Sequence, residues 1–174
     1  MNILRTPPDQ MDYQWQKSEK GLPLIPPKIW SLFHHRGSLT QYLRERGVVL
    51  KLLVLEDGPI KFNIELAEIL RTKNQIKGLW SRKVAMLIDN EAIVYGHTIL
   101  ENPESQSKLT DVLSLHEKSL GDWLFSHRDL SRSDFEFVTY ESTSVARRSV
   151  FAIRSGQLIV AEFFPPRIFN LFSS

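Results

Sequence analysis

The fold is decided by residues 80–100, which read WSRKVAMLIDNEAIVYGHTIL. From Trp80 to Ile88 the even positions carry the bulky apolar side chains, so period-2 alternation predicts a strand with one core face. A turn at residues 89–91 leads into a second apolar run, residues 92–100, and the two strands are predicted to form an antiparallel hairpin. The core face of the first strand also carries Arg82, a cation at a position where an apolar side chain is expected.

A second hairpin is predicted at the end of the chain, from residues 147–154 and 157–164, joined by Ser155 and Gly156. Pro165 and the proline after it end the last strand, because proline cannot donate to a strand ladder.

Glu162 lies in the middle of the last strand and shares a face with Leu158, Val160 and Phe164. Removing a lone carboxylate from water costs several kcal/mol, so such a group is paired, hydrogen-bonded or used for chemistry. The alternative is an edge strand that leaves Glu162 in solvent. The alternation favours neither reading by itself.

The rest of the chain adds short helices and further strands. Ser38 and Gln41 form a capping-box pattern that opens a helix ending at Gly47. The other elements expected are helices at residues 28–36, 64–71, 108–116 and from 119 onward, and strands at residues 48–55 and 135–141, with a turn at residues 56–59 (EDGP). About six strands joined mostly by hairpins predict an α+β domain: a single six-stranded antiparallel sheet with short helices packed on it.

Composition indicates one globular domain of ordinary type, with 42% hydrophobic and 24% charged residues in a chain of 174. Residues 1–27 are expected to form a proline-rich arm, extended over the surface or disordered, and residues 28–174 the domain itself. No stretch is apolar enough for a membrane span, and the N-terminus lacks the layout of a signal peptide. We therefore expect a soluble protein, a monomer, in the cytoplasm, or in the plastid stroma if the gene is plastid-encoded.

Several classes of function lack their motifs. There is no phosphate-binding loop, dinucleotide fingerprint, nucleophile elbow or H-E-x-x-H zinc motif. The chain has no cysteine, and its five histidines form no ligand cluster: two are adjacent on a predicted helix, so their side chains diverge, and three are scattered. No metal site is therefore predicted. The net charge of +2 comes from interspersed residues and does not indicate a nucleic-acid partner.

What remains is Arg82 and Glu162, two charges assigned to core faces of different hairpins. They can form a buried salt bridge with each other. They can also line a pocket in which the guanidinium grips a ligand carboxylate and Glu162 contacts another part of the same small organic acid. Arg147 and Arg148 point to opposite faces of their strand, so one is a candidate for a second anion contact and the other for solvent.

Five segments in order resemble the chorismate pyruvate-lyase family. They are Trp80-Ser81-Arg82, Gly96-His97-Thr98, residues 119–125 (SLGDWLF), residues 146–149 (ARRS) and residues 162–166 (EFFPP). Upstream, residues 37–40 (GSLT) resemble the helix-opening segment of the family. The likeness spans about residues 28–166 and is nearest to the chorismate lyase-like proteins of cyanobacteria and algal plastids.

The resemblance implies a cofactor-independent carbon–oxygen lyase that cleaves chorismate to 4-hydroxybenzoate and pyruvate, for quinone head groups such as those of plastoquinone and ubiquinone. It implies that Arg82 holds the ring carboxylate and that Glu162 lies near the hydroxyl end of the substrate. Leu39 and Leu120 match positions that line the pocket. A second cation is expected for the pyruvyl carboxylate, and the candidates are Arg147 and Arg148. Glu162 can be a base or can orient the hydroxyl, and an intramolecular hydrogen transfer would need no base.

Two other functions are alternatives to the lyase activity. The effector domains of one family of bacterial transcription regulators resemble the same fold, so a non-catalytic binding domain for aromatic acids is the main alternative. Those domains follow a DNA-binding helix-turn-helix segment, and the proline-rich arm offers none. Nucleic-acid binding through Arg36, Arg44, Arg46 and Lys51 has only a surface of mixed charge behind it.

Overall fold

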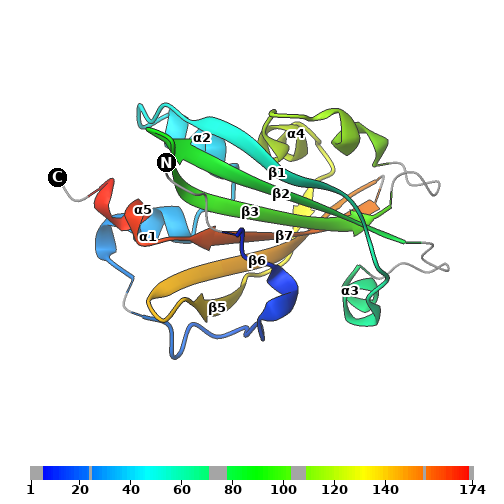
Figure 1. Ribbon diagram of the computed structural model, residues 1–174, viewed down its shortest axis with the longest axis horizontal. Coiled ribbons are helices and arrows are strands. Elements are labelled where there is room, and N and C mark those ends of the chain that lie inside the picture. The colour runs from blue at the N-terminus through cyan, green and yellow to red at the C-terminus, as the bar shows by residue number, and fades with distance from the viewer. Residues whose placement is uncertain (1–5, 24, 71–77, 103–108, 155, 173–174) are drawn as a thin grey trace.

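The protein folds around one antiparallel sheet, and Figure 1 shows the arrangement. The computed structural model describes residues 6–23, 25–70, 78–102, 109–154 and 156–172. The described residues contain seven strands, β1 (Lys51–Ile60), β2 (Leu79–Ile88), β3 (Glu91–Glu101), β4 (Ser131–Arg132), β5 (Glu136–Tyr140), β6 (Ser144–Ile153) and β7 (Gly156–Phe164). Their order is β1-β2-β3-β7-β6-β4, and β5 also pairs with β6. The α+β prediction is confirmed, whereas the count of six strands was one too low because β4 has only two residues.

The central hairpin forms as predicted. Asp89 and Asn90 have φ angles of 49° and 63°, which is the left-handed conformation that a two-residue hairpin turn requires. The β6–β7 hairpin also forms, with Ile153 paired to Gly156, although Ser155 lies outside the described residues. Strand β7 pairs with β3 on one side and β6 on the other, so Glu162 is on a central strand and the edge-strand alternative is wrong.

The turn expected at residues 56–59 does not exist, because β1 continues through it to Ile60. A bulge between Val54 and Glu56 shifts the register, and Pro59 is tolerated because β1 lies at the edge of the sheet. The side chains that looked like turn formers instead bond to β2. Trp80 donates its Nε1–H to Asp57 over 2.6 Å, and Ser81 donates to Glu56 over 3.0 Å.

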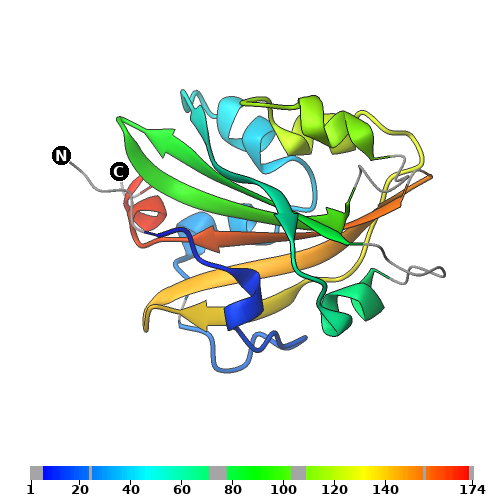
Figure 2. The same ribbon diagram turned by 45° about the vertical axis from the view of Figure 1, so that its right-hand side comes forward.

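Most of the short helices cover one face of the sheet, as Figures 1 and 2 show, whereas the helix at Ile64–Ile69 packs on the opposite face, near Leu79, Ile99 and Ile159. Two serines cap the pair that matters most for the site: Ser38 accepts from the N–H of Gln41, and Ser119 from that of Asp122. The helices are α1 (Pro27–Phe33), α2 (Leu39–Arg44), α3 (Ile64–Ile69), α4 (Leu120–Phe125) and α5 (Arg167–Asn170), and 3₁₀ turns occur at η1 (Gln10–Asp12) and η3 (Thr110–Ser114). The helix expected at residues 108–116 is therefore this 3₁₀ turn, and residue 108 lies outside the described residues.

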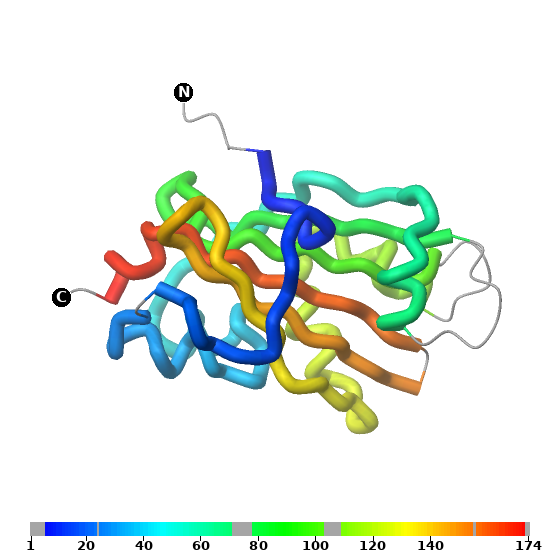
Figure 3. Tube along the Cα trace, turned by 90° about the horizontal axis from the view of Figure 1, so that it is seen from below, coloured from blue at the N-terminus to red at the C-terminus, as the bar shows by residue number. Residues whose placement is uncertain are grey.

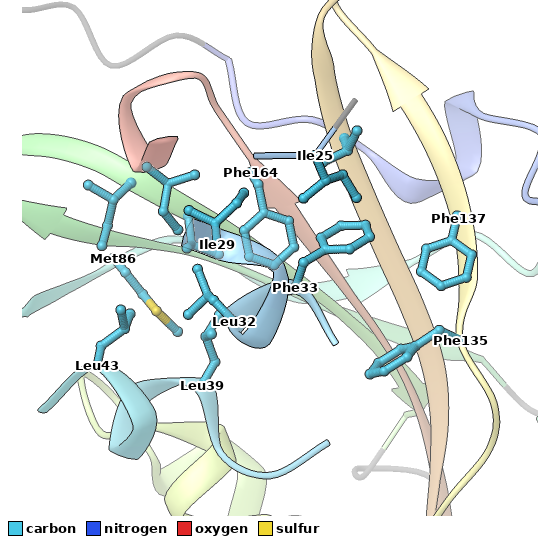
Figure 4. Close-up of a cluster of buried hydrophobic side chains, with 14 residues drawn as sticks. Ile25, Ile29, Leu32, Phe33, Leu39, Leu43, Met86, Phe135, Phe137 and Phe164 are labelled. Carbon is cyan, nitrogen blue, oxygen red and sulfur yellow. The ribbon is translucent and has the colours of Figure 1, made fainter. Parts of the chain in front are cut away.

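The core on the helical face consists of two apolar clusters. The first lies under α1, α2 and α5 and includes Phe33, Met86 and Phe164, and Figure 4 shows these side chains packed between α1 and the strands. The second lies under η3 and α4 and includes Leu124 and Phe151. The polar residues described below lie between these two clusters.

The N-terminal segment crosses the opposite face of the sheet, in dark blue in Figure 3. Trp15 stacks edge-on against Phe163 with ring centroids 5.9 Å apart, and Gln16 forms an antiparallel bridge with Phe137 at the edge of β5. Gln10 is buried and donates its backbone N–H to Nδ1 of His97 over 3.0 Å. The described part of the arm is therefore attached to the sheet by specific contacts.

His97 is neutral in this network. Burial lowers its pKa to about 4, and the charge of Lys83 acts in the same direction while Asp9 and Glu56 oppose it. Because Nδ1 accepts the Gln10 N–H, the ring proton is on Nε2, which lies 3.0 Å from the hydroxyl of Ser81. The approach of Asp9 to 3.5 Å from Nδ1 is accordingly not an ion pair at neutral pH.

We expect His97→Gln to flatten the pH dependence of stability between pH 6.5 and about 4. In the wild type the contribution of neutral His97 to the free energy of unfolding is complete above pH 6.5. It is lost as the pH falls toward the pKa of His97 in the folded protein, about 4. The loss is roughly 3 kcal/mol, because the unfolded side chain takes up the proton first. Urea unfolding at several pH values measures the difference between the two proteins.

The matched control is His127→Gln, which removes a histidine just beyond α4 whose Nδ1 lies 2.9 Å from the carbonyl of Trp123. Its stability should follow the wild-type pH curve. A His97→Gln curve parallel to that of the wild type would contradict the neutral, arm-binding role of His97.

Candidate functional site

A cavity of about 60 Å³ lies between the helical face of the sheet and the helices α2 and α4. A cavity of this volume holds a few water molecules and is smaller than the roughly 150 Å³ that admits a benzene ring. Its walls are mainly apolar and include Val84, Met86, Leu124, Phe151 and Val160. Both charges predicted from the sequence, Arg82 and Glu162, line it.

Arg82 forms one polar end of the cavity and is only 2% exposed. Its Nη1 donates to the Asp57 carboxylate over 2.7 Å, and its Nη2 donates to the backbone carbonyl of His116. Its Nε is buried without a hydrogen-bond partner among the described residues. A buried donor without a partner costs about 1–3 kcal/mol, which an acceptor on a bound ligand would offset.

Asp57 can hold Arg82 because the bulge in β1 places the two residues directly opposite each other on neighbouring strands. The second oxygen of Asp57 accepts the N–H of Trp80, which fixes the carboxylate. The guanidinium is therefore oriented before any ligand arrives.

Glu162 forms the other polar end, with 12% of its side chain exposed. Arg147 lies opposite it on β6 and donates Nε–H to Glu162 Oε2 over 2.6 Å. Arg132 approaches the same oxygen with Nη2 at 3.5 Å. Because both cations use Oε2, the other oxygen of the carboxylate is left for the cavity.

Glu162 remains ionised despite its burial. Burial alone raises the pKa of this carboxyl, but the charges of Arg147 and Arg132 and the hydrogen bond from Arg147 outweigh it, and the pKa is below its ordinary value. A carboxylate stabilised in this way is a weak base and a good hydrogen-bond acceptor.

The same two arginines hold the chain segment that leads into α2. Arg147 is fully buried and donates Nη1–H to the carbonyls of Phe33 and His35 over 2.6 and 2.8 Å. Arg132 donates to the carbonyl of Arg36 over 2.9 Å. Glu162 thus neutralises the two cations that bind the segment before α2 to the sheet.

Arg82 and Glu162 do not pair with each other, so the predicted alternative of a mutual salt bridge is wrong. Arg82 pairs across β2 and β3 with Thr98, which faces Val160 on β7, whereas Glu162 faces Gly96. The two charged residues are thus two strand spacings apart and two residues offset, or about 12 Å between Cα atoms. A ligand with two polar ends can lie between them.

Leu39 and Leu120 both line the cavity, as the first residues of α2 and α4. The two helices are tied together by polar contacts at their N-termini. Ser119 donates to Thr40 over 2.9 Å. Asp122 accepts from Ser38 over 3.1 Å and from Arg44 over 2.6 Å. These contacts make α2 and α4 a single cover.

Gly121 is needed at this junction. A Cβ atom there would lie 2.9 Å from the hydroxyl of Ser38, closer than packed atoms allow. The glycine therefore permits the close approach of α4 to the start of α2.

Arg147 and Arg148 point to opposite faces, as the alternation predicted. Arg148 bonds to Glu136 over 2.7 Å and stacks over Trp15 on the face away from the cavity. Only 12% of its side chain is exposed, so the prediction that one arginine meets solvent is wrong. Neither arginine is among the described residues that line the cavity.

Sequence reasoning missed three residues of the cavity and its surroundings. Asp57 was assigned to a turn because it stands next to glycine and proline. Arg132 lies on a strand of two residues, too short for any periodic pattern, yet it is held between the rings of Phe135 and Phe151 at 4.4 and 4.5 Å. Lys118 belongs to a loop and has no distinguishing motif. No group of metal-ligating side chains occurs in the part of the chain that the structure describes.

Fold and site together define a small α+β domain with a mainly apolar cavity that has a cation at one end and a carboxylate at the other. Among its described helices, none is long and apolar enough to cross a membrane.

A family model described as chorismate lyase matches residues 10–173. The protein belongs to the chorismate lyase family.

Curated relatives agree with this placement at low identity. The chain is 27% identical over 146 residues to a probable chorismate pyruvate-lyase of Pseudoalteromonas translucida, covering 74% of this chain and 79% of the relative. It is 27% identical over 169 residues to the probable enzyme of Coxiella burnetii, with 83% and 89% coverage. It is 22% identical over 147 residues to chorismate pyruvate-lyase of Escherichia coli O7:K1, with 84% and 88% coverage. These matches do not show the predicted closer similarity to cyanobacterial and plastid members of the family.

Solved structures share the fold. The effector domain of PhnF from Mycobacterium smegmatis superposes with a TM-score of 0.53 at 12% identity, over 84% of this chain and 93% of that domain. PhnF itself gives a TM-score of 0.57 at 11% identity, over 78% and 67% of the two chains. At such identities the likeness concerns the fold alone.

We expect Glu162→Gln to lower the free energy of unfolding by about 3–5 kcal/mol, because it leaves Arg147 and Arg132 buried without a counter-charge. In the wild type this stabilisation is complete above pH 4.5 and is lost as the pH falls through the lower pKa of the folded state. Chemical denaturation at neutral pH measures the effect.

Glu136→Gln provides the matched control, since Glu136 pairs with Arg148 at a site where it is 32% exposed. It should cost less than about 1 kcal/mol. Equal losses in the two variants would show that the cluster around Glu162 has no special role.

Proposed function

We propose that this protein is a chorismate pyruvate-lyase that cleaves chorismate to 4-hydroxybenzoate and pyruvate. The observation that carries the proposal is the cavity that has Arg82, with its Nε unpartnered among the described residues, at one end and an ionised Glu162 at the other. Family membership and the names of the curated relatives support the same activity.

The spacing of the two ends suits a ring substituted in the para positions. With the ring carboxylate at Arg82 and the hydroxyl at Glu162, each end makes one charge-assisted hydrogen bond of about 2.8 Å. Asp57 keeps the guanidinium in place, and the apolar walls, with Leu39 and Leu120 above, enclose the ring. The enclosure excludes water and fixes the ring in one orientation.

The reaction needs little chemistry from the protein. The bond between the ring and the enolpyruvyl oxygen breaks, the hydrogen on the hydroxyl-bearing carbon leaves, and one hydrogen is added to the methylene carbon to give the methyl group of pyruvate. Atoms and electrons balance without an oxidant or a cofactor. Aromatisation of the ring drives the elimination, and the protein lowers the barrier by orientation and by stabilising developing charge.

Glu162 acts in this proposal by orienting the hydroxyl. Its carboxylate is stabilised by two arginines and is therefore poorly suited to remove a proton from carbon. Direct transfer of the ring hydrogen to the enolpyruvyl group needs no base and agrees with this environment. Because the product keeps both polar ends, it should leave slowly and inhibit the enzyme.

A role in quinone head-group synthesis, a cytoplasmic or plastid location and a monomeric state belong to the same proposal. They follow from the resemblance to the family rather than from the geometry of the site.

The decisive test mixes purified protein with chorismate and follows 4-hydroxybenzoate by absorbance and pyruvate by a coupled assay. Both products should form in equal amounts. Arg82→Gln should lower kcat/KM and raise the dissociation constant of 4-hydroxybenzoate, each by about 10- to 150-fold, because one charge-assisted contact contributes about 1.5–3 kcal/mol.

The absence of both products with the wild type would contradict the proposal. Binding of 4-hydroxybenzoate without turnover would instead support the non-catalytic binding domain. Glu136→Gln, on the opposite face of the sheet, serves as the activity control.

The pH dependence of turnover distinguishes the two roles of Glu162. If it orients the hydroxyl, kcat/KM should not fall with decreasing pH until below about 5, because the pKa of the carboxyl is lower than 4.5. A base matched to neutral pH would instead give an acid limb with a midpoint between about 6 and 7. A full pH profile with chorismate measures this, and such a limb, absent from the titration of the substrate alone, would refute the orienting role.

A further inference from the structure

Chorismate carries two carboxylates, and the residues described so far bind only one of them. Arg147 is occupied by Glu162 and by backbone carbonyls, and Arg148 lies on the opposite face with Glu136. Arg132 also lines the cavity, but it is occupied by Ser149, Glu162 and the carbonyl of Arg36. The carboxylate of the enolpyruvyl group therefore finds no unoccupied cation among these arginines.

Lys118 is a cation that lines the same cavity. It stands in the loop between η3 and α4, directly before the cap residue Ser119 and close to Leu120. Its side chain is exposed, and none of the ion pairs among the described residues includes it. Its ammonium group is thus available to a ligand.

Arg82 positions the loop that carries Lys118. It donates Nη2–H to the carbonyl of His116, two residues earlier. His116 has a φ of 47°, a left-handed conformation that is unusual for a residue with a side chain, and the backbone N–H of Lys118 donates to Leu115 over 2.7 Å. The loop is therefore held in a defined shape, with Lys118 at the same end of the cavity wall as Arg82.

The position of the enolpyruvyl group follows from the orientation of the ring. Its oxygen is attached to the carbon beside the hydroxyl-bearing carbon, so it projects sideways from the axis between Arg82 and Glu162. A cavity of about 60 Å³ is smaller than the roughly 150 Å³ that admits a benzene ring, so it has no room for the enolpyruvyl side chain as well. The side chain must accordingly extend to the part of the wall that reaches solvent, which is where Lys118 is exposed.

We propose that Lys118 binds the enolpyruvyl carboxylate of the substrate. This inference rests on the proposed function and adds to it a contact by which the protein discriminates substrate from product. Arg82 and Glu162 contact groups that chorismate and 4-hydroxybenzoate share, whereas Lys118 contacts a group that only the substrate has. It therefore favours substrate binding over product retention.

The test compares two stable aromatic ligands by calorimetry. One is 3-(carboxymethoxy)-4-hydroxybenzoate, which carries a second carboxylate in place of the enolpyruvyl one, and the other is 3-ethoxy-4-hydroxybenzoate, of similar size without that charge. Lys118→Met should weaken binding of the first by about 3- to 10-fold, because a partly exposed charge pair contributes modestly, and leave the second unchanged. Lys118→Arg should restore the preference.

Kinetics give a second readout. Lys118→Met should raise KM for chorismate by a similar factor and leave the inhibition constant of 4-hydroxybenzoate unchanged. Lys51→Met, which removes an exposed lysine at the start of β1 outside the cavity lining, should behave as the wild type.

Equal effects of Lys118→Met on the two aromatic ligands, or none on either, would overturn the assignment. A wild type that shows the predicted ligand preference without converting chorismate would disprove the lyase activity and leave Lys118 as an anion-binding residue. The two proposals therefore fail separately.

Discussion

The structure depends on the ion pair between Arg147 and Glu162, with Arg132 as a second cation on the same carboxylate oxygen. Removing these charges from water is costly, and only mutual pairing with full hydrogen bonding offsets the cost. The arginines meet most of this requirement by also donating to the carbonyls of Phe33, His35 and Arg36, although Nη2 of Arg147 is buried without a partner among the described residues. One buried cluster thus holds the β6–β7 pair, the segment before α2 and the carboxylate of the site in a single arrangement.

The two polar ends of the cavity belong to separate networks. Arg82 is held by Asp57 on the edge strand and by the loop before α4, whereas Glu162 is held by strands on the other side of β3. The spacing between them is set by the backbone geometry of the sheet and does not depend on flexible side chains. A rigid sheet therefore sets the length of the ligand, and the joined helices α2 and α4 close the space above it.

Much of the fold could be predicted because its signals are local. The turn at Asp89 and Asn90, the cap at Ser38 and the helix that starts at residue 119 depend on a few neighbouring residues, and all were confirmed. The prediction of a turn at residues 56–59 was wrong because glycine and proline usually mark a turn, whereas an edge strand tolerates both. The role of Arg132 could not be predicted from the sequence, because a strand of two residues shows no periodicity. The role depends on contacts with residues that are far away in the sequence.

By itself the sequence determined which face of its strand each side chain takes, because alternation is a property of the extended backbone. That placed Arg82 and Glu162 on the core face and separated Arg147 from Arg148. Only the tertiary structure decided the partners: that β7 lies between β3 and β6, that Arg82 pairs with Asp57, and that Glu162 pairs with Arg147. These pairings join strands far apart along the chain, so their register depends on the packing of the whole sheet rather than on any local pattern.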